Sequence, residues 1–329
     1  VAVAPIDGET GVDLLKHADL ALYRAKRGGK SDFHFFEPSL DEQARVRREM
    51  ELDLRLAIKD GGFELYFQPL YSLAREELEG FEALIRWNHP KRGMISPAEF
   101  IPLAEETGLI LQIGEWVVRE ACRSAREWPE HLSVSVNVSA KQFSTPGLTT
   151  TILQALTQSG LRPNRLELEI TESVFLDDSE GTDATFAALK AVGVRLALDD
   201  FGTGYSSLGY LKNAPFDKIK IDQGFVRGAT MPGSRNGAII AAISSLANAL
   251  GMDTTAEGVE TLDELELIRM HGCSHIQGYI YSKPLSTAEA DARLEEGLKA
   301  RPSGPRAARE PRQAMLRRVV LQHDEDFYN

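Results

Sequence analysis

The sequence predicts an α/β fold, most simply a (β/α)8 barrel of the TIM type, on two observations. Strand patterns and helix patterns alternate over about 230 residues, and eight strand patterns in that length have the proportions of this barrel. In addition, polar and acidic residues follow almost every predicted strand. An open doubly wound sheet is the alternative fold with the same alternation.

The strand patterns are short apolar runs bounded by turn residues. They span residues 64–70, 78–85, 133–138, 166–171, 194–198, 216–221, 253–256 and 274–277. Capping-box patterns start two of the intervening helices, at Ser96 with Glu99 and at Thr261 with Glu264. Glycines fall where several helices are expected to end: Gly108, Gly160, Gly193, Gly251 and Gly272.

The composition limits both the partners and the compartment. The chain has 49 acidic and 37 basic residues, a formal net charge of −12, whereas a protein that grips long nucleic acid needs a basic surface. Only two cysteines occur, Cys122 and Cys273, which indicates a reducing, cytoplasmic location. No apolar run approaches the roughly 20 residues that span a bilayer, so we expect no membrane contact in this sequence. Because the chain begins with Val1, we expect a longer protein with any sensory domain or membrane anchor upstream.

The two ends of the chain differ from its middle. Apolar spacing predicts a helix over 13–27, and a short aromatic strand follows at 33–36; together they are too little to bury a core. A charged amphipathic helix is expected from 39 to 60. Beyond residue 292, and most clearly from Ala300, the composition is typical of a disordered tail.

Two adjacent acids, Asp199 and Asp200, end the predicted strand at 194–198. Successive strand residues point to opposite faces, so both acids can serve one site only where the strand gives way to the loop. Their charges repel unless a cation neutralises them or one carboxyl holds a proton. A glycine-rich turn with Gly202 and Gly204 follows, and Tyr205, Ser206 and Ser207 are expected to open the next helix.

Further polar residues follow the other strands, and in a barrel the C-terminal ends of the strands converge on one face. Crowding of this many acids requires cations, and carboxylate with amide oxygens suits Mg²⁺ or Mn²⁺ rather than zinc. Two such ions about 3.5–4 Å apart would form a clamp for phosphoester hydrolysis. The candidate residues are Gln68, Glu82, Asn137, Glu169, Glu172, Asp199, Asp200, Lys220, Asp222, Glu257, Glu260 and Gln277.

Several ordered motifs resemble the EAL domain, the family of cyclic-di-GMP phosphodiesterases. They are Glu82-Ala83-Leu84 itself, NVS at 137–139, ELEITES at 167–173, DDFGTGYSS at 199–207, KIKID at 218–222, AEGVET at 256–261 and QGY at 277–279. The resemblance implies a (β/α)8 barrel with one antiparallel strand over residues 39–292, and a homodimer. The segment 17–36 resembles the end of a GGDEF (diguanylate cyclase) domain, so residues 1–38 are interpreted as its C-terminal fragment and 293–329 as the tail.

The same resemblance implies a role for each candidate. Glu82, Asn137, Glu169 and Asp199 would hold one metal ion, and Asp199 with Asp200 would hold a second. Lys220 and Glu257 would position and deprotonate the attacking water, with Glu257 acting through the second metal as the alternative. Gln277 would orient the water or ligand, and Glu172 would brace the Asp199–Asp200 loop. The substrate contacts would come from Arg86, Gln68, Asp222 and Glu260.

The implied reaction is hydrolysis of one phosphodiester of cyclic di-GMP, which gives the linear dinucleotide pGpG. Metal binding lowers the pKa of water from about 15.7 towards about 7, which makes hydroxide available at neutral pH. The rival interpretation is a catalytically silent EAL module that binds cyclic di-GMP or a partner protein. Such modules lose metal ligands or the base, and every mapped position is intact here.

Overall fold

The computed structural model describes residues 1–28, 33–175, 180–202, 211, 215–297, 299, 302 and 305. The chain divides into two compact units, Val1–Glu64 with Arg86–Ile113 and Leu65–Ile85 with Gly114–Asn329. No helix in the described part combines the length and apolar character of a membrane-spanning segment. The helix expected to open at Tyr205, Ser206 and Ser207, and most of the expected tail, lie outside the described residues.

The first unit contains three helices and a short strand: α1 (Gly11–Gly28), α2 (Pro38–Asp60), α3 (Pro97–Thr107) and β3 (Gly93–Ile95). Its core forms around Trp87, whose ring meets Phe100 edge-on with 5.5 Å between ring centroids. Two expectations are wrong here. Residues 33–36 form no strand, because their backbone hydrogen bonds to Val1, through His34 and Phe36, do not continue into a ladder. Ser96 precedes α3 but its side chain makes no cap hydrogen bond, so the predicted capping box is absent.

The second unit is a closed barrel of eight strands. Their order around the barrel is β1-β9-β8-β7-β6-β5-β4-β2, and β2 pairs with β1 to close it. β1 runs antiparallel to β9, whereas the neighbours from β2 through β9 are parallel. The predicted barrel with one antiparallel strand is therefore confirmed. The strands are β1 (Phe63–Ser72), β2 (Glu77–His89), β4 (Ser133–Val138), β5 (Leu166–Thr171), β6 (Arg195–Phe201), β7 (Lys218–Ile221), β8 (Asp253–Ala256) and β9 (His275–Gln277).

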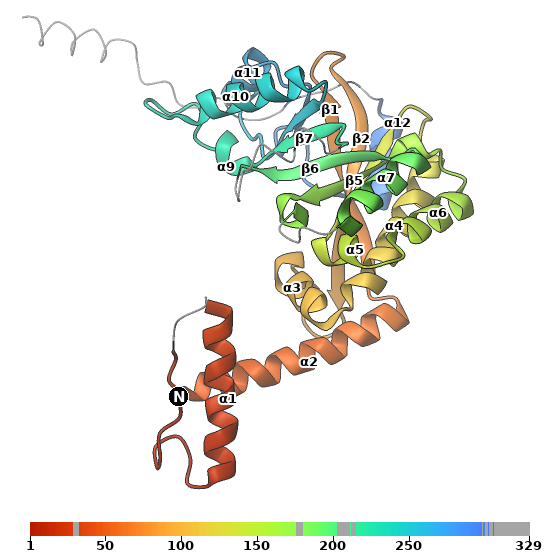
Figure 1. Ribbon diagram of the computed structural model, residues 1–329. Helices are drawn as coiled ribbons and strands as arrows, with labels where there is room; N and C mark the ends of the chain where they lie inside the picture. Colours follow the sequence, from red (N-terminus) through yellow and green to blue (C-terminus); the bar gives the residue numbers. More distant parts are fainter. Residues whose placement is uncertain are drawn as a thin grey trace, which may run out of the picture. The chain divides into compact units, whose positions relative to one another are not determined.

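Helices follow the strands of this unit and surround them (Figure 1). Thr261 and Glu264 form the predicted capping box at the start of α11, and Gly160 ends α6 in the left-handed conformation with φ 69°. A short strand, β10 (Leu285–Ser286), pairs antiparallel with Tyr66 and Phe67 of β1 and has no counterpart in the predicted set. The remaining elements are α4 (Ile110–Glu127), α5 (Ala140–Ser144), α6 (Leu148–Ser159), η1 (Pro163–Arg165), η2 (Glu172–Phe175), α7 (Glu180–Val192), α9 (Gln223–Val226), α10 (Asn236–Ala249), α11 (Leu262–Met270) and α12 (Thr287–Glu295).

The strands are buried on both faces, yet one face carries charge. On β5, Leu166, Leu168 and Ile170 are fully buried and alternate with the buried acids Glu167 and Glu169. Since successive side chains point to opposite faces, the apolar set packs on one side and the acids line the other. The charged face of each strand therefore collects inside the barrel and positions the site.

Candidate active site

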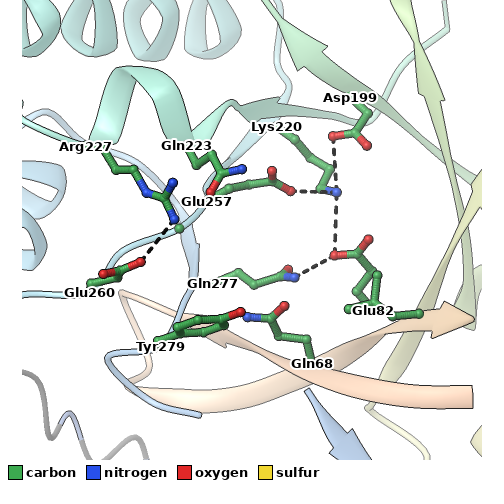
Figure 2. A pocket seen from close by; sticks show the side chains of 12 residues that line it. Gln68, Glu82, Asp199, Lys220, Gln223, Arg227, Glu257, Glu260, Gln277 and Tyr279 are labelled. Carbon is green, nitrogen blue, oxygen red and sulfur yellow. Dashed lines mark hydrogen bonds and ion pairs between the residues drawn. The ribbon is translucent and has the colours of Figure 1, made fainter. Parts of the chain in front are cut away.

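A pocket of about 260 Å³ opens where β1, β2, β6, β7, β8 and β9 bring polar residues together (Figure 2). Its lining carries four acids and two bases, a charge pattern quite unlike that of an apolar ligand cavity. The lining residues are Gln68, Glu82, Leu84, Asp199, Lys220, Gln223, Arg227, Glu257, Gly258, Glu260, Gln277 and Tyr279.

Lys220 stands at the centre of the acidic residues. Its Nζ lies 2.5 Å from Glu169 Oε2, 2.7 Å from Glu257 Oε1 and 3.2 Å from Asp199 Oδ1. The ammonium also lies 3.8 Å from Glu82 Oε2, and the lysine side chain is only 3% exposed. One buried cation thus joins carboxylates contributed by four different strands or strand ends, which no local sequence pattern could bring together.

Glu82 is fixed by two side-chain amides. Asn137 Nδ2 donates to Glu82 Oε1 at 2.7 Å, and Gln277 Nε2 donates to Glu82 Oε2 at 2.6 Å. Both oxygens of this carboxylate therefore have defined directions, set by residues from β4 and β9. The structure brings Asn137 and Gln277 to Glu82 as the sequence predicted, although Asn137 does not line the pocket itself.

Asp199 and Asp200 reach one place by a route that the sequence did not predict. Strand β6 continues through both acids to Phe201, and the register against β7 shifts between Leu198 and Phe201. Two residues therefore stand opposite one on β7, which is a β-bulge, and Asp200 adopts a φ of 54° in the left-handed region. The bulge, rather than the end of the strand, turns both carboxylates towards the same site.

Glu172 supports the segment after this bulge. The backbone N–H of Gly202 donates to Glu172 Oε1 at 2.9 Å, and Glu172 itself is 8% exposed. Its second oxygen, Oε2, is buried without a hydrogen-bond partner among the described residues. The placement agrees with a bracing position next to Asp199 and Asp200, while the catalytic consequence stays a prediction.

The crowding of charges shifts several pKa values. Burial alone would lower the pKa of Lys220, but Asp199, Glu169, Glu257 and Glu82 together raise it well above its ordinary value. Burial raises the pKa of Glu257 to about 8. Burial, with Glu82 as the nearest like charge, also raises the pKa of Glu169 well above its ordinary value. The single positive charge of Lys220 therefore does not neutralise the four carboxylates around it.

The donor set fits divalent cations. Asp199, Asp200 and Glu257 each offer a carboxylate oxygen, and these atoms lie within 4.8 Å of one another. Glu82 and Glu169 add two more carboxylates around Lys220. Oxygen ligands of this kind are those that hard divalent cations prefer. Asp199 of this cluster is buried, Glu257 is half-buried and Asp200 is exposed, so the cluster is able to hold a metal ion that enters from the pocket side.

The remaining predicted residues divide into two groups. Gln68 and Glu260 line the pocket. Asp222 does not; its side chain accepts from the backbone N–H of Gly224 at 2.8 Å and caps the short helix α9. Arg86 lies on the part of β2 that belongs to the first unit. The substrate contacts assigned to these residues stay predictions.

Sequence reasoning missed four polar or small residues of the pocket lining: Gln223, Arg227, Gly258 and Tyr279. A usable signal existed, because each of them follows the end of a predicted strand within seven residues. The loops after barrel strands form the face on which sites of this architecture lie.

The fold and the site together define a (β/α)8 barrel protein with a lysine-centred acidic site suited to divalent cations. The EAL domain family matches residues 51–284, and the chain belongs to this family. The match includes the strand that carries Glu82-Ala83-Leu84 and every strand of the barrel that contributes to the site.

Two relatives and one solved structure are similar to the chain. An uncharacterized protein y4lL of Sinorhizobium fredii is 46% identical over 86% of this chain and 34% of its own length. The bifunctional diguanylate cyclase/cyclic di-GMP phosphodiesterase MucR of Pseudomonas aeruginosa is 41% identical over 87% of this chain and 42% of its own length. The structure of the PaMucR phosphodiesterase in complex with c-di-GMP is 41% identical, with a TM-score of 0.70 over 74% of this chain and 99% of that one. The chain thus spans well under half the length of these curated relatives.

Proposed function

We propose that this chain is a phosphodiesterase module that hydrolyses cyclic di-GMP to linear pGpG with the help of two divalent cations, Mg²⁺ or Mn²⁺. The observation that carries the proposal is the meeting of Glu82, Glu169, Asp199 and Glu257 around Lys220. All of these except Glu169 line one pocket. The MucR relative, whose name includes cyclic di-GMP phosphodiesterase, supports the same substrate. Membership of the EAL domain family supports the reaction class.

The residues divide into ligands and proton carriers. Glu82, Asn137, Glu169 and Asp199 would hold one ion, and Asp199 with Asp200 a second. When bound, these ions would screen the anionic diester and acidify the attacking water. The hydrogen bonds from Asn137 and Gln277 keep the Glu82 oxygens directed into the site. Glu172 holds the segment that carries the two aspartates through Gly202.

Lys220 and Glu257 would act on the water. Glu257 lines the pocket and lies 2.7 Å from Lys220 Nζ, a position from which its carboxylate would accept the proton of the attacking water. Lys220 donates to Glu257 and stabilises its charged form. The water oxygen forms a bond to phosphorus, the bond from phosphorus to the ribose 3′ oxygen breaks, and that oxygen takes up a proton from solvent.

The experiment is incubation of the purified chain with cyclic di-GMP and Mg²⁺ or Mn²⁺, followed by chromatographic separation of the products. We expect pGpG from the native chain and, because a metal ligand is lost, at least about a hundredfold less from a Glu82→Gln variant. A Glu115→Gln variant is the matched control, since Glu115 lies on the exposed surface of α4 and pairs with Arg119. Binding of cyclic di-GMP without pGpG would contradict the proposal and support the receptor interpretation.

The same proposal covers the N-terminal segment, the oligomeric state and the location of the chain. Residues 1–38 would be the C-terminal fragment of a GGDEF domain, supported by the resemblance of the segment 17–36. The barrel, residues 39–292, would act as a homodimer in the cytoplasm, with the remaining sensory domains upstream. The two buried thiols, Cys122 and Cys273, agree with a reducing compartment.

A further inference from the structure

We propose that Arg227 is a substrate-positioning residue that binds the phosphodiester of cyclic di-GMP that is not cleaved. The inference rests on the proposed function and deepens it. It begins from the charges of the pocket lining, where Lys220 and Arg227 are the cationic side chains among the described residues, against the acids Glu82, Asp199, Glu257 and Glu260. A dinucleotide with two phosphates needs positive charge at two places.

Lys220 cannot serve the second phosphate. Its side chain is 3% exposed, and its ammonium nitrogen lies within 4.0 Å of carboxylate oxygens from Glu82, Glu169, Asp199 and Glu257. An ammonium group has only three N–H donors. These donors already face carboxylates, so Lys220 acts on the acidic centre and has none left for a ligand at the pocket mouth.

Arg227 has the opposite properties. It directly follows the short helix α9, and its side chain is 58% exposed. Its Nη2 lies 3.2 Å from Glu260 Oε1, and it forms no other ion pair with the residues that the structure describes. A guanidinium group offers five N–H donors in a planar fork. One donor on Glu260 therefore fixes the orientation and leaves the rest of the fork for a ligand.

The backbone around Arg227 is held in place. Its N–H donates to the carbonyl of Gln223 at 2.8 Å, and its carbonyl accepts from Asn236 Nδ2 at 3.2 Å. In Figure 2, Arg227 and Glu260 lie on one side of the pocket and Glu82 and Asp199 on the other. A ligand that spans the pocket can place one phosphate at the acidic centre and the other at the arginine.

A planar fork matches two phosphate oxygens, and such charge-assisted pairs are among the stronger hydrogen bonds. The alternative ligand group is the edge of a guanine, which is neutral and also accepts from arginine. The phosphate is favoured here because Arg227 is the exposed one of the two cationic side chains in the lining, and an anionic group gains more from a guanidinium than a neutral guanine edge does. The two assignments differ in how binding responds to salt.

The test is steady-state kinetics of the native chain and an Arg227→Ala variant with cyclic di-GMP over a series of KCl concentrations. We expect KM to rise about tenfold in the variant, with kcat within about twofold because the acidic centre is untouched. The salt dependence of KM should also be weaker in the variant. Arg227→Lys should recover part of the loss, because it keeps the charge and loses the fork.

An Arg123→Ala variant is the matched control, because Arg123 is 76% exposed on α4 and pairs with Glu120. Its KM should equal that of the native chain. An unchanged KM in Arg227→Ala would overturn the inference, and a raised KM with unchanged salt dependence would overturn the phosphate assignment in favour of a neutral group. A native chain that forms no pGpG would contradict the proposed function instead, so the two failures are distinct.

Discussion

At the residue scale, the site is defined by the hydrogen-bond and ion-pair partners of its buried acids. Glu82 has two amides, and Lys220 contacts four carboxylates. A separate buried set contains Glu167, which lies 2.7 Å from Lys218 Nζ and accepts from Ser135 at 3.1 Å. Glu167 is paired with Lys218, which lies two residues before Lys220 on β7. Glu167 and Lys218 therefore form a second buried ion pair, separate from the acids that surround Lys220.

Glu79 is a paired acid whose contribution depends on pH. Although burial opposes it, the hydrogen bond and charge of His275, together with Arg75, lower the pKa of Glu79 to about 2. A lowered folded-state pKa stabilises the protein above the unfolded pKa of 4.5, and the contribution is lost as the pH falls towards about 2.

The expected result is that Glu79→Gln loses unfolding free energy at pH 7 and differs less from the native chain as the pH falls below 4.5. Urea unfolding at several pH values measures this. Glu77→Gln, on the same strand, serves as the control. A difference between the native chain and Glu79→Gln that stays constant down to about pH 2 would contradict the assignment.

At the element scale, bulges and close strand contacts aim the site residues. The bulge in β6 turns Asp199 and Asp200 to one place, and α9 presents Arg227 directly after the strand that carries Lys220. β2 depends on a glycine, since Gly80 stands opposite Ser133 of β4 two residues before Glu82. A Cβ at Gly80 would lie 2.4 Å from the Ser133 carbonyl oxygen, which is backbone and cannot swing away.

We therefore expect Gly80→Ala to force β2 and β4 apart. The free energy of unfolding should fall by about 2–4 kcal/mol, the range of overpacking in a tight core. Urea unfolding measures the change, and Gly11→Ala is the control because no atom lies within 4 Å of the added Cβ there. Equal stability of Gly80→Ala and the native chain would show that the strands can separate without cost.

At the scale of the whole molecule, the barrel holds an excess of buried negative charge that only folding assembles. Glu82, Glu169, Asp199 and Glu257 meet around one ammonium, with Asp200 close by. In the unfolded chain these acids are far apart and bind divalent cations weakly. A cation that binds the folded chain more tightly stabilises it by mass action.

Divalent cations should therefore raise the thermal midpoint of the chain. At a free concentration a hundredfold above Kd, the stabilisation is about 2.7 kcal/mol. Scanning calorimetry with Mg²⁺, with EDTA and with NaCl at equal ionic strength separates specific binding from screening. Asp199→Asn should abolish most of the rise. A rise of the same size in that variant would place the binding elsewhere.

The sequence by itself determined the barrel, six of its eight strands within about two residues of their bounds, and the acids that meet at its mouth. It could do so because strand patterning and strand-end polarity are local properties that the chain carries in order. Tertiary structure alone decided the bulge that turns Asp199 and Asp200 together, the four-carboxylate surroundings of Lys220, and the arginine at the pocket mouth. Register between strands and the approach of distant side chains depend on packing across the whole barrel, which no window of sequence contains.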